Sequence, residues 1–96
     1  MRAWQIDTFG SPAALRTLPD PVPGPGQARV AIHACGLNFA DLLMADGKYQ
    51  EKPTLPFIPG LELAGTVLDL GPGTQGPPPG TRVAVYGGQG GLAEQG

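Results

Sequence analysis

Apolar residues alternate with polar ones along much of the chain, and this alternation predicts strands. Between Arg29 and Cys35 the apolar side chains recur at every second position and share one face of an extended chain: Val30, Ile32 and Ala34. The same reasoning predicts further strands over residues 2–7, 15–18, 62–70 and 82–86. Disordered segments do not sustain such a period, so we expect a folded, mainly β domain.

Two of these strands carry further expectations. The run from residue 62 to 70 is apolar at Leu63, Val67 and Leu68, and we expect it to be buried on much of both faces. His33 falls on the face of its strand opposite to Val30. This position indicates a solvent-facing or packed histidine rather than a catalytic one.

A change of period after Gly36 predicts one short helix over residues 39–46. Its apolar residues fall at i, i+3 and i+4, the spacing of one helical face: Phe39, Leu42 and Leu43. Asn38 is a favoured N-cap residue, and Asp41 stands in the first turn, where the helix dipole favours negative charge. Gly47 can end the helix in the left-handed conformation. Local sequence therefore accounts for both ends of this helix.

The chain contains 16 glycines and 12 prolines, which concentrate between the predicted strands. Proline lacks a backbone N–H and is excluded from sheet interiors, so segments 19–26, 50–60 and 71–80 are predicted to be irregular connections. After the glycine-rich segment 87–91 only a few residues follow. We expect the chain to stop there without a closing element, as a fragment of a longer protein does.

Two glycine-rich stretches imitate the G-x-G-x-x-G fingerprint of dinucleotide-binding proteins. Gly71–Gly76 is followed by Pro77–Pro79, which removes amides where the phosphate-binding helix must run. Gly88–Ala93 matches the variant that ends in alanine, yet too few residues follow it to form a helix. Both stretches are predicted to be connections between strands. The chain alone is therefore not expected to bind NADPH tightly or to turn over a substrate.

Charge and cysteine content exclude several classes of protein. Lys and Arg total 6 against 8 Asp and Glu, and the net charge of -2 offers no basic field for nucleic acid or a membrane surface. Cys35 is the only cysteine, which excludes an internal disulfide and a four-cysteine zinc lobe and indicates an ordinary semi-buried thiol. No segment has the apolar length of a signal peptide or membrane span, and we expect a cytoplasmic protein.

Five segments carry a resemblance to a known family over nearly the whole chain: Met1–Trp4, Ala34–Asp41, Gly47–Tyr49, Pro59–Val67 and Gly80–Val83. Together they resemble the GroES-like domain of medium-chain dehydrogenases and reductases, most closely the quinone oxidoreductase and zeta-crystallin branch. The resemblance implies a GroES-like partial β-barrel with one short helix over residues 1–96. It also implies a following nucleotide-binding domain that holds most of the NADPH, and a homodimeric full-length protein.

The zinc-dependent alcohol dehydrogenases of this family carry a ligand cysteine and a ligand histidine at the positions of Asn38 and Leu61. Neither an amide nor an aliphatic side chain replaces a thiolate and an imidazole, so no metal site is expected. Glu62 remains from the zinc pattern. Without a Lewis acid to acidify an alcohol, a conjugated acceptor is the easier substrate. The resemblance likewise implies hydride transfer from NADPH to a quinone or another conjugated carbonyl compound.

The resemblance implies catalytic roles for Asn38 and Tyr49, and it places Asn38 and Asp41 beside the bound cofactor. The residues themselves leave alternatives open, because Asn38 is also a plausible helix cap and Tyr49 a plausible surface aromatic. Leu43 stands where this branch often carries a second tyrosine, which leaves the substrate class open. Two other functions fit the sequence: an enoyl-thioester or acrylyl-type reductase of the same superfamily, and a noncatalytic GroES-like binding module.

Overall fold

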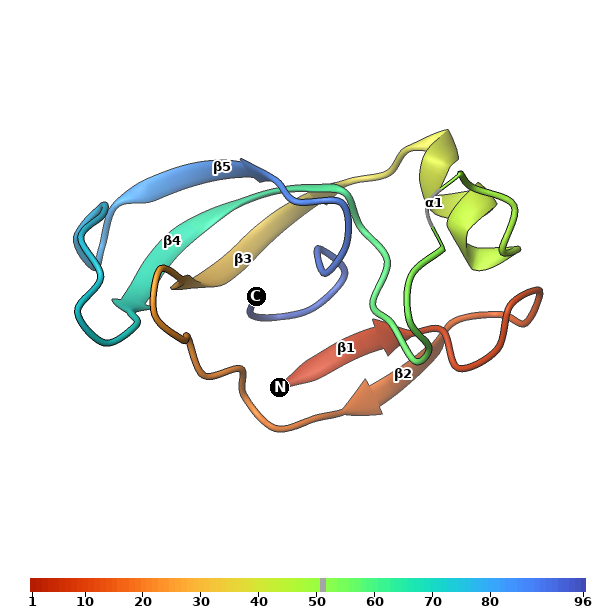
Figure 1. Cartoon of the computed structure of the whole chain (residues 1–96), viewed down its shortest axis with the longest axis horizontal. Helices are drawn as coiled ribbons and strands as arrows, with labels where there is room; N and C mark the ends of the chain where they lie inside the picture. Colours follow the sequence, from red (N-terminus) through yellow and green to blue (C-terminus); the bar gives the residue numbers. More distant parts are fainter. Residues whose placement is uncertain (51) are drawn as a thin grey trace.

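The computed structural model describes residues 1–50 and 52–96, and within them the chain forms five strands and one helix (Figure 1). The elements are β1 (Arg2–Gln5), β2 (Ala14–Thr17), β3 (Ala28–Gly36), α1 (Phe39–Ala45), β4 (Glu62–Leu70) and β5 (Arg82–Tyr86). β1 and β2 form an antiparallel pair, and β3, β4 and β5 form an antiparallel sheet in that order. The order and type of every element agree with the sequence prediction.

The last residues of the chain join the two sheets. The Leu92 carbonyl oxygen accepts a hydrogen bond from the Trp4 amide of β1 (2.9 Å), and the Gly96 carbonyl oxygen accepts one from the Val30 amide of β3 (2.7 Å). Residues 92–96 thus run between β1 and β3, as Figure 1 shows. The expectation of an end without a closing element was wrong, because these pairings are long-range and leave no local pattern in so glycine-rich a segment.

A second link between the sheets passes beside the hydrophobic core. The amides of Ile6 and Phe57 each donate to the other's carbonyl oxygen, at 2.8 and 3.0 Å. Both side chains are buried and form the core with Met44 and Leu61. This small core therefore lies between α1 and the segments that follow β1 and precede β4, and no continuous ladder joins the two sheets. This is the mainly β partial barrel with one short helix that the resemblance implies.

The helix faces the core with a different side from the predicted one. Phe39 and Leu42 are 73% and 63% exposed, whereas Met44 is 5% exposed and packs in the core. Ala40 also packs against the core from the inner side of α1. A seven-residue helix docks where the preceding strand places it, and small side chains on its inner side allow close approach. The predicted apolar stripe was therefore wrong for Phe39 and Leu42.

Burial of the central sheet also differs from the sequence pattern. In β4, Val67 is 2% exposed but Leu68 is 37% exposed, so this strand is not buried on both faces as predicted. In β3, the register shifts between Ile32 and Ala34, and Ala34 is exposed rather than sharing the face of Ile32. Such a bulge inserts one residue and reverses the faces beyond it. An alternation read from sequence cannot locate that reversal.

Acid is expected to weaken the link that residues 92–96 provide. The Arg2 backbone amide donates to the Glu94 carboxylate and its guanidinium lies 3.5 Å away, which lowers the pKa of Glu94 below its usual 4.5. A lowered folded-state pKa contributes stability above the usual pKa, and this contribution is lost as the pH falls through the folded value. We expect the urea midpoint, followed by Trp4 fluorescence, to fall between about pH 5 and about pH 3.

The Glu94→Gln variant is the control for this titration, because glutamine keeps the shape but does not ionise. Its midpoint is expected to fall less over the same pH range than that of the unmodified chain. An equal fall in both proteins would assign the acid sensitivity to other carboxylates, such as Asp7 and Asp20, whose pKa values are also lowered by hydrogen-bond partners.

Candidate functional site

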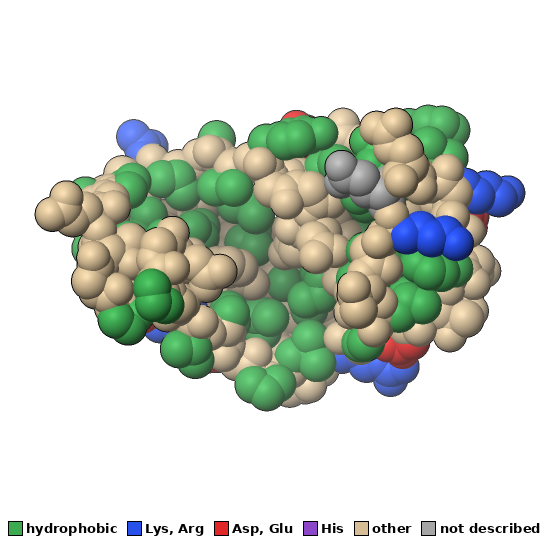
Figure 2. All heavy atoms as spheres, viewed as in Figure 1, with side chains coloured by type: hydrophobic (Ala, Val, Ile, Leu, Met, Phe, Trp, Pro, Cys, Tyr) green, Lys and Arg blue, Asp and Glu red, His purple; other side chains and the backbone are tan. Residues whose placement is uncertain are grey.

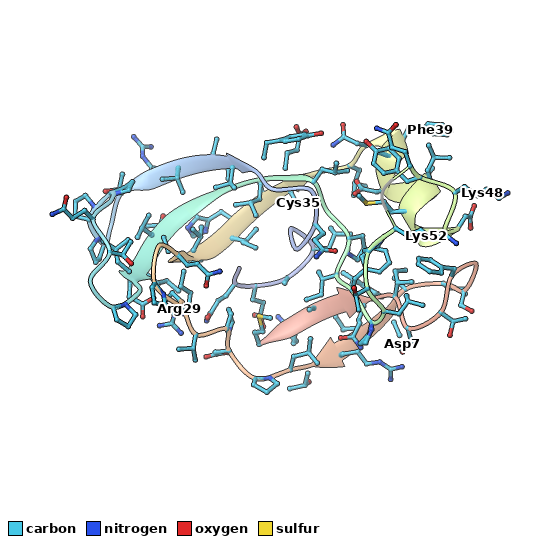
Figure 3. All side chains as sticks on the ribbon, in the orientation of Figure 1. Asp7, Arg29, Cys35, Phe39, Lys48 and Lys52 are labelled. Atoms are coloured by element: carbon cyan, nitrogen blue, oxygen red, sulfur yellow. The ribbon has the colours of Figure 1, made fainter. Side chains whose placement is uncertain are left out.

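One end of the three-stranded sheet brings together three loops. β3 ends at Gly36, β4 begins at Glu62 and β5 ends at Tyr86, and these residues lie directly opposite one another. Because the strands are antiparallel, the loops that follow β3 and β5 and the loop that precedes β4 meet at this edge. α1 begins here, and Figure 3 shows Phe39 of α1 at the opposite end of the sheet from Arg29. We call this end of the sheet the helix-side edge.

Backbone hydrogen bonds hold two of these loops closely together. The amides of residues 90, 91 and 92 donate to the carbonyl oxygens of Ile58, Gly60 and Pro59 at 2.7, 3.0 and 2.9 Å, respectively. Gly60 has φ +115, and a Cβ built on it would lie 2.8 Å from the Gly91 Cα. Only glycine fits both the backbone conformation and the close approach at this position.

A buried carboxylate links the third loop to the other two. Asp41 of α1 is 7% exposed, and its Oδ2 accepts from the Asn38 amide at 2.9 Å. Its Oδ1 accepts from the buried Gly60 amide at 3.1 Å. Backbone N–H donors of this kind offset the cost of burying a carboxylate. The sequence placed Asp41 in the first helical turn but gave no sign of its bond to Gly60, which lies 19 residues away.

Asn38 occupies the predicted N-cap position, although its side chain makes no capping hydrogen bond. Its backbone is extended, with φ -128 and ψ 155, and of the two contacts of a capping box only the one between the Asp41 carboxylate and the Asn38 amide is a hydrogen bond. The Asp41 amide donates to the Asn38 carbonyl oxygen at 3.0 Å, and the Asp41 carboxylate binds the Asn38 amide. Asn38 is exposed at the helix-side edge, so its side-chain amide is available to a ligand.

Tyr49 lies in a different environment from Asn38. It is half-buried, and its side chain packs against the core cluster of Ile6, Met44, Phe57 and Leu61. Tyr49 is therefore more enclosed than the surface aromatic considered as an alternative. The structure brings Asn38 and Asp41 together, whereas Tyr49 follows the other end of α1 in the chain and packs against the core. The chemical roles of these three residues stay predictions.

A shallow depression of about 410 Å³ opens on the sheet beside this edge. Its lining includes three alanines that lie opposite one another in neighbouring strands: Ala34, Ala64 and Ala84. Glu62 and Tyr86 stand at its rim, and the Tyr86 residue is 74% exposed. Sequence reasoning did not single out Tyr86. The sequence does place Tyr86 at the end of a predicted strand, two positions after the small residue Ala84. This was the signal from which Tyr86 could have been singled out.

Exposed apolar side chains surround the Asn38 position. Leu37, Phe39 and Leu42 are 76%, 73% and 63% exposed. Figure 2 shows apolar side chains gathered at the surface near α1 and over the sheet. An amide between apolar neighbours suits a ligand that is mostly apolar and carries a few polar atoms.

The comparison with known families decides the identity of the fold. Residues 24–95 match the model of the alcohol dehydrogenase GroES-like domain. The chain belongs to this family. The match covers β3, α1, β4 and β5, and so it includes the three loops of the helix-side edge.

Two proteins similar to this GroES-like domain are named for quinone oxidoreductase. A quinone oxidoreductase-like protein 2 homolog of Nematostella vectensis is 52% identical over 73 residues, which are 75% of this chain and 20% of that protein. The quinone oxidoreductase of Thermus thermophilus, solved also as its complex with NADPH, has a TM-score of 0.84 at 40% identity over 99% of this chain and 28% of its own.

A human synaptic vesicle membrane protein VAT-1 homolog-like protein aligns with a TM-score of 0.91 at 34% identity, over 99% of this chain and 31% of its own. The chain thus spans between 20% and 31% of the length of these three relatives. In residues 1–50 and 52–96 of the chain itself, no helix is long and apolar enough to cross a membrane.

Asn38 and Leu61 stand where the zinc-dependent enzymes of the family carry ligands, and the two residues differ in burial. Leu61 is 3% exposed and packs in the hydrophobic core, while Asn38 is exposed. Across the part of the chain that the structure describes, no three His, Cys, Asp or Glu side chains gather as a metal site would require. An aliphatic side chain in the core and a neutral amide do not supply the ligands that Zn²⁺ prefers.

Cys35 in this GroES-like domain is poorly suited to nucleophilic chemistry. Figure 3 shows it on β3, and it is half-buried. Burial raises the pKa of its thiol, and the nearby carboxylates of Asp41 and Glu62 raise it further. A thiol with a raised pKa holds little of the reactive thiolate at neutral pH. The ordinary, semi-buried thiol expected from the sequence agrees with these surroundings.

Proposed function

We propose that this GroES-like domain is the substrate-side part of an NADPH-dependent oxidoreductase that reduces quinones or other conjugated carbonyl compounds without zinc. The observation that carries the proposal is the exposed side-chain amide of Asn38 at the helix-side edge, beside the buried carboxylate of Asp41. The similarity to quinone oxidoreductases over 99% of the chain supports the same reaction class.

The proposed reaction places two hydrogen-bond donors of this chain near the acceptor carbonyl. NADPH, when bound, supplies a hydride. Hydride addition to a quinone builds negative charge on a carbonyl oxygen, and a donor aimed at that oxygen stabilises the transition state. The Asn38 side-chain N–H is the proposed donor. The Tyr49 hydroxyl is the proposed source of the proton that completes reduction to the hydroquinone.

The residues at the helix-side edge also account for the zinc independence that we propose. Placing Leu61 in the core leaves no imidazole to reach a metal beside Asn38. A carbonyl conjugated to a ring or a double bond spreads its developing charge, so hydrogen bonds replace the Lewis acid. Asn38 and Asp41 are proposed to lie beside the nicotinamide, with Asp41 acting from its buried position.

The NADPH diphosphate is proposed to bind outside this chain, because the glycine-rich stretches have other uses. The Gly90 and Gly91 amides of the second stretch donate to Ile58 and Gly60 carbonyl oxygens, so they are not free to bind phosphate. The first stretch forms part of the connection between β4 and β5 and is followed by three prolines.

We therefore expect the 96-residue chain on its own to bind NADPH too weakly to saturate at micromolar concentrations. Titration of NADPH fluorescence against the isolated chain is the measurement, with circular dichroism to verify that the chain is folded. The complete protein that carries this chain is the positive control. Micromolar affinity of the folded chain would show that it contains a nucleotide site of its own.

Steady-state assays of the complete protein test the proposed reaction. NADPH oxidation is followed with 1,4-benzoquinone and with a crotonyl thioester, and the protein is analysed for metal after dialysis. Faster turnover of the quinone by zinc-free protein is the expected result. Preference for the thioester would favour an enoyl-thioester reductase. Reduction of neither compound would favour a noncatalytic binding module, and a stoichiometric zinc would contradict the zinc-independent mechanism.

A further inference from the structure

We infer that Asp41 is a positioning residue, which holds two loops of the helix-side edge together and thereby fixes the place of Asn38 relative to the Gly60 loop. This inference rests on the proposed function. It assigns Asp41 an indirect role, through Asn38, in place of a direct contact with the reacting atoms.

The hydrogen bonds of Asp41 define what it holds. Oδ2 binds the Asn38 amide at 2.9 Å, where the chain leaves β3 and enters α1. Oδ1 binds the Gly60 amide at 3.1 Å, immediately before β4. Gly60 in turn accepts a hydrogen bond from Gly91 at 3.0 Å, after β5. One buried side chain thereby joins two of the loops, and the backbone bond between Gly91 and Gly60 joins the third.

The same bonds engage the backbone of Asn38 and not its side-chain N–H. An asparagine at an N-cap ordinarily accepts a hydrogen bond from an amide of the first helical turn. Here the Asp41 amide instead donates to the Asn38 carbonyl oxygen at 3.0 Å, and the Asn38 side chain makes no capping hydrogen bond. The Asp41 carboxylate thus holds the backbone from which the exposed Asn38 side chain extends, and the side-chain N–H of Asn38 is a donor that helix capping does not use.

Two acceptor atoms are needed for this arrangement. An asparagine at position 41 has nearly the same shape but only one acceptor oxygen, so it can satisfy one of the two amides. Its NH₂ group would then face the other amide, donor against donor. Asp41→Asn therefore releases one loop with little change in volume. Asn38 would remain present but be misplaced relative to the Gly60 loop.

A double-mutant cycle in the complete protein tests the inference. Asp41→Asn is made with Asn38 present and in an Asn38→Ala background, and kcat and KM are measured with NADPH and 1,4-benzoquinone. We expect kcat to fall by about 10-fold or more with Asn38 present, because small displacements of a catalytic donor are costly. In the Asn38→Ala background the further fall is expected to be less than about 3-fold, since coupled residues are not additive.

Asp46→Asn is the matched control, because Asp46 is exposed at the other end of α1 and the change removes the same charge. It is expected to leave kcat unchanged. If Asp41→Asn is not recovered folded, Asp41→Glu, which keeps both acceptors on a longer side chain, takes its place in the cycle with the same expected coupling.

Equal losses of kcat in the two backgrounds would overturn the inference, since Asp41 would then act independently of Asn38. A change in thermal stability with unaltered kcat would overturn it as well. The proposed function fails separately: the unmodified protein would not reduce the quinone, or Asn38→Ala alone would leave kcat unchanged.

Discussion

Asn38→Asp in the complete protein is expected to lower kcat/KM for quinone reduction by about 100-fold, the scale of losing one donor to a developing oxyanion. An aspartate side chain accepts hydrogen bonds but cannot donate one when ionised. Folding is expected to survive, because Asp is as good an N-cap residue as Asn. The structure adds a second reason, since the Asn38 side chain makes no capping bond that could be lost.

The matched control for this prediction is Gln75→Glu, the same change from amide to carboxylate. Gln75 is exposed in the connection between β4 and β5, at the end of the sheet away from α1. Thermal unfolding and steady-state kinetics of both variants separate stability from catalysis. If Asn38→Asp is as active as the unmodified protein, the catalytic role of Asn38 must be abandoned, and its position at the start of α1 has only a structural meaning.

Gly60→Ala is expected to destabilise the domain by on the order of 3 kcal/mol. An alanine at a positive φ costs roughly 1–2 kcal/mol, and forcing a methyl group into a packed contact costs about 1–3 kcal/mol more. The methyl group would lie 2.8 Å from the Gly91 backbone, at which distance one loop must move. The same movement would stretch the hydrogen bond from the Gly60 amide to Asp41.

Gly73→Ala separates these two costs. Gly73 also has a positive φ of 65, but an added Cβ there meets no atom within 4 Å. It is expected to cost only about 1 kcal/mol, from backbone strain alone. Urea unfolding of the two variants is the measurement. Equal losses of unfolding free energy would show that the Gly60 and Gly91 backbones separate easily, and that the helix-side edge is less rigid than the structure indicates.

Elements governed by neighbouring residues were predictable from the sequence. The strands Arg82–Tyr86 and Glu62–Leu70 have the bounds predicted from their sequence pattern, between segments rich in glycine and proline. The helix lies between the N-cap position of Asn38 and the left-handed Gly47, which has φ +71. Capping, proline exclusion and strand periodicity act over a few residues, so one segment of sequence contains all the information that they need.

Contacts between distant segments were decided only by the tertiary structure. The sequence contains no signal that residues 92–96 bridge β1 and β3, that Phe39 faces outward, or that the Asp41 carboxylate reaches Gly60. Each depends on how the sheet curves and where the helix docks, which the whole chain sets through its core. The sequence thus determined the elements and the chemical groups of the candidate site. Their meeting at one edge required the antiparallel register that places Gly36, Glu62 and Tyr86 side by side.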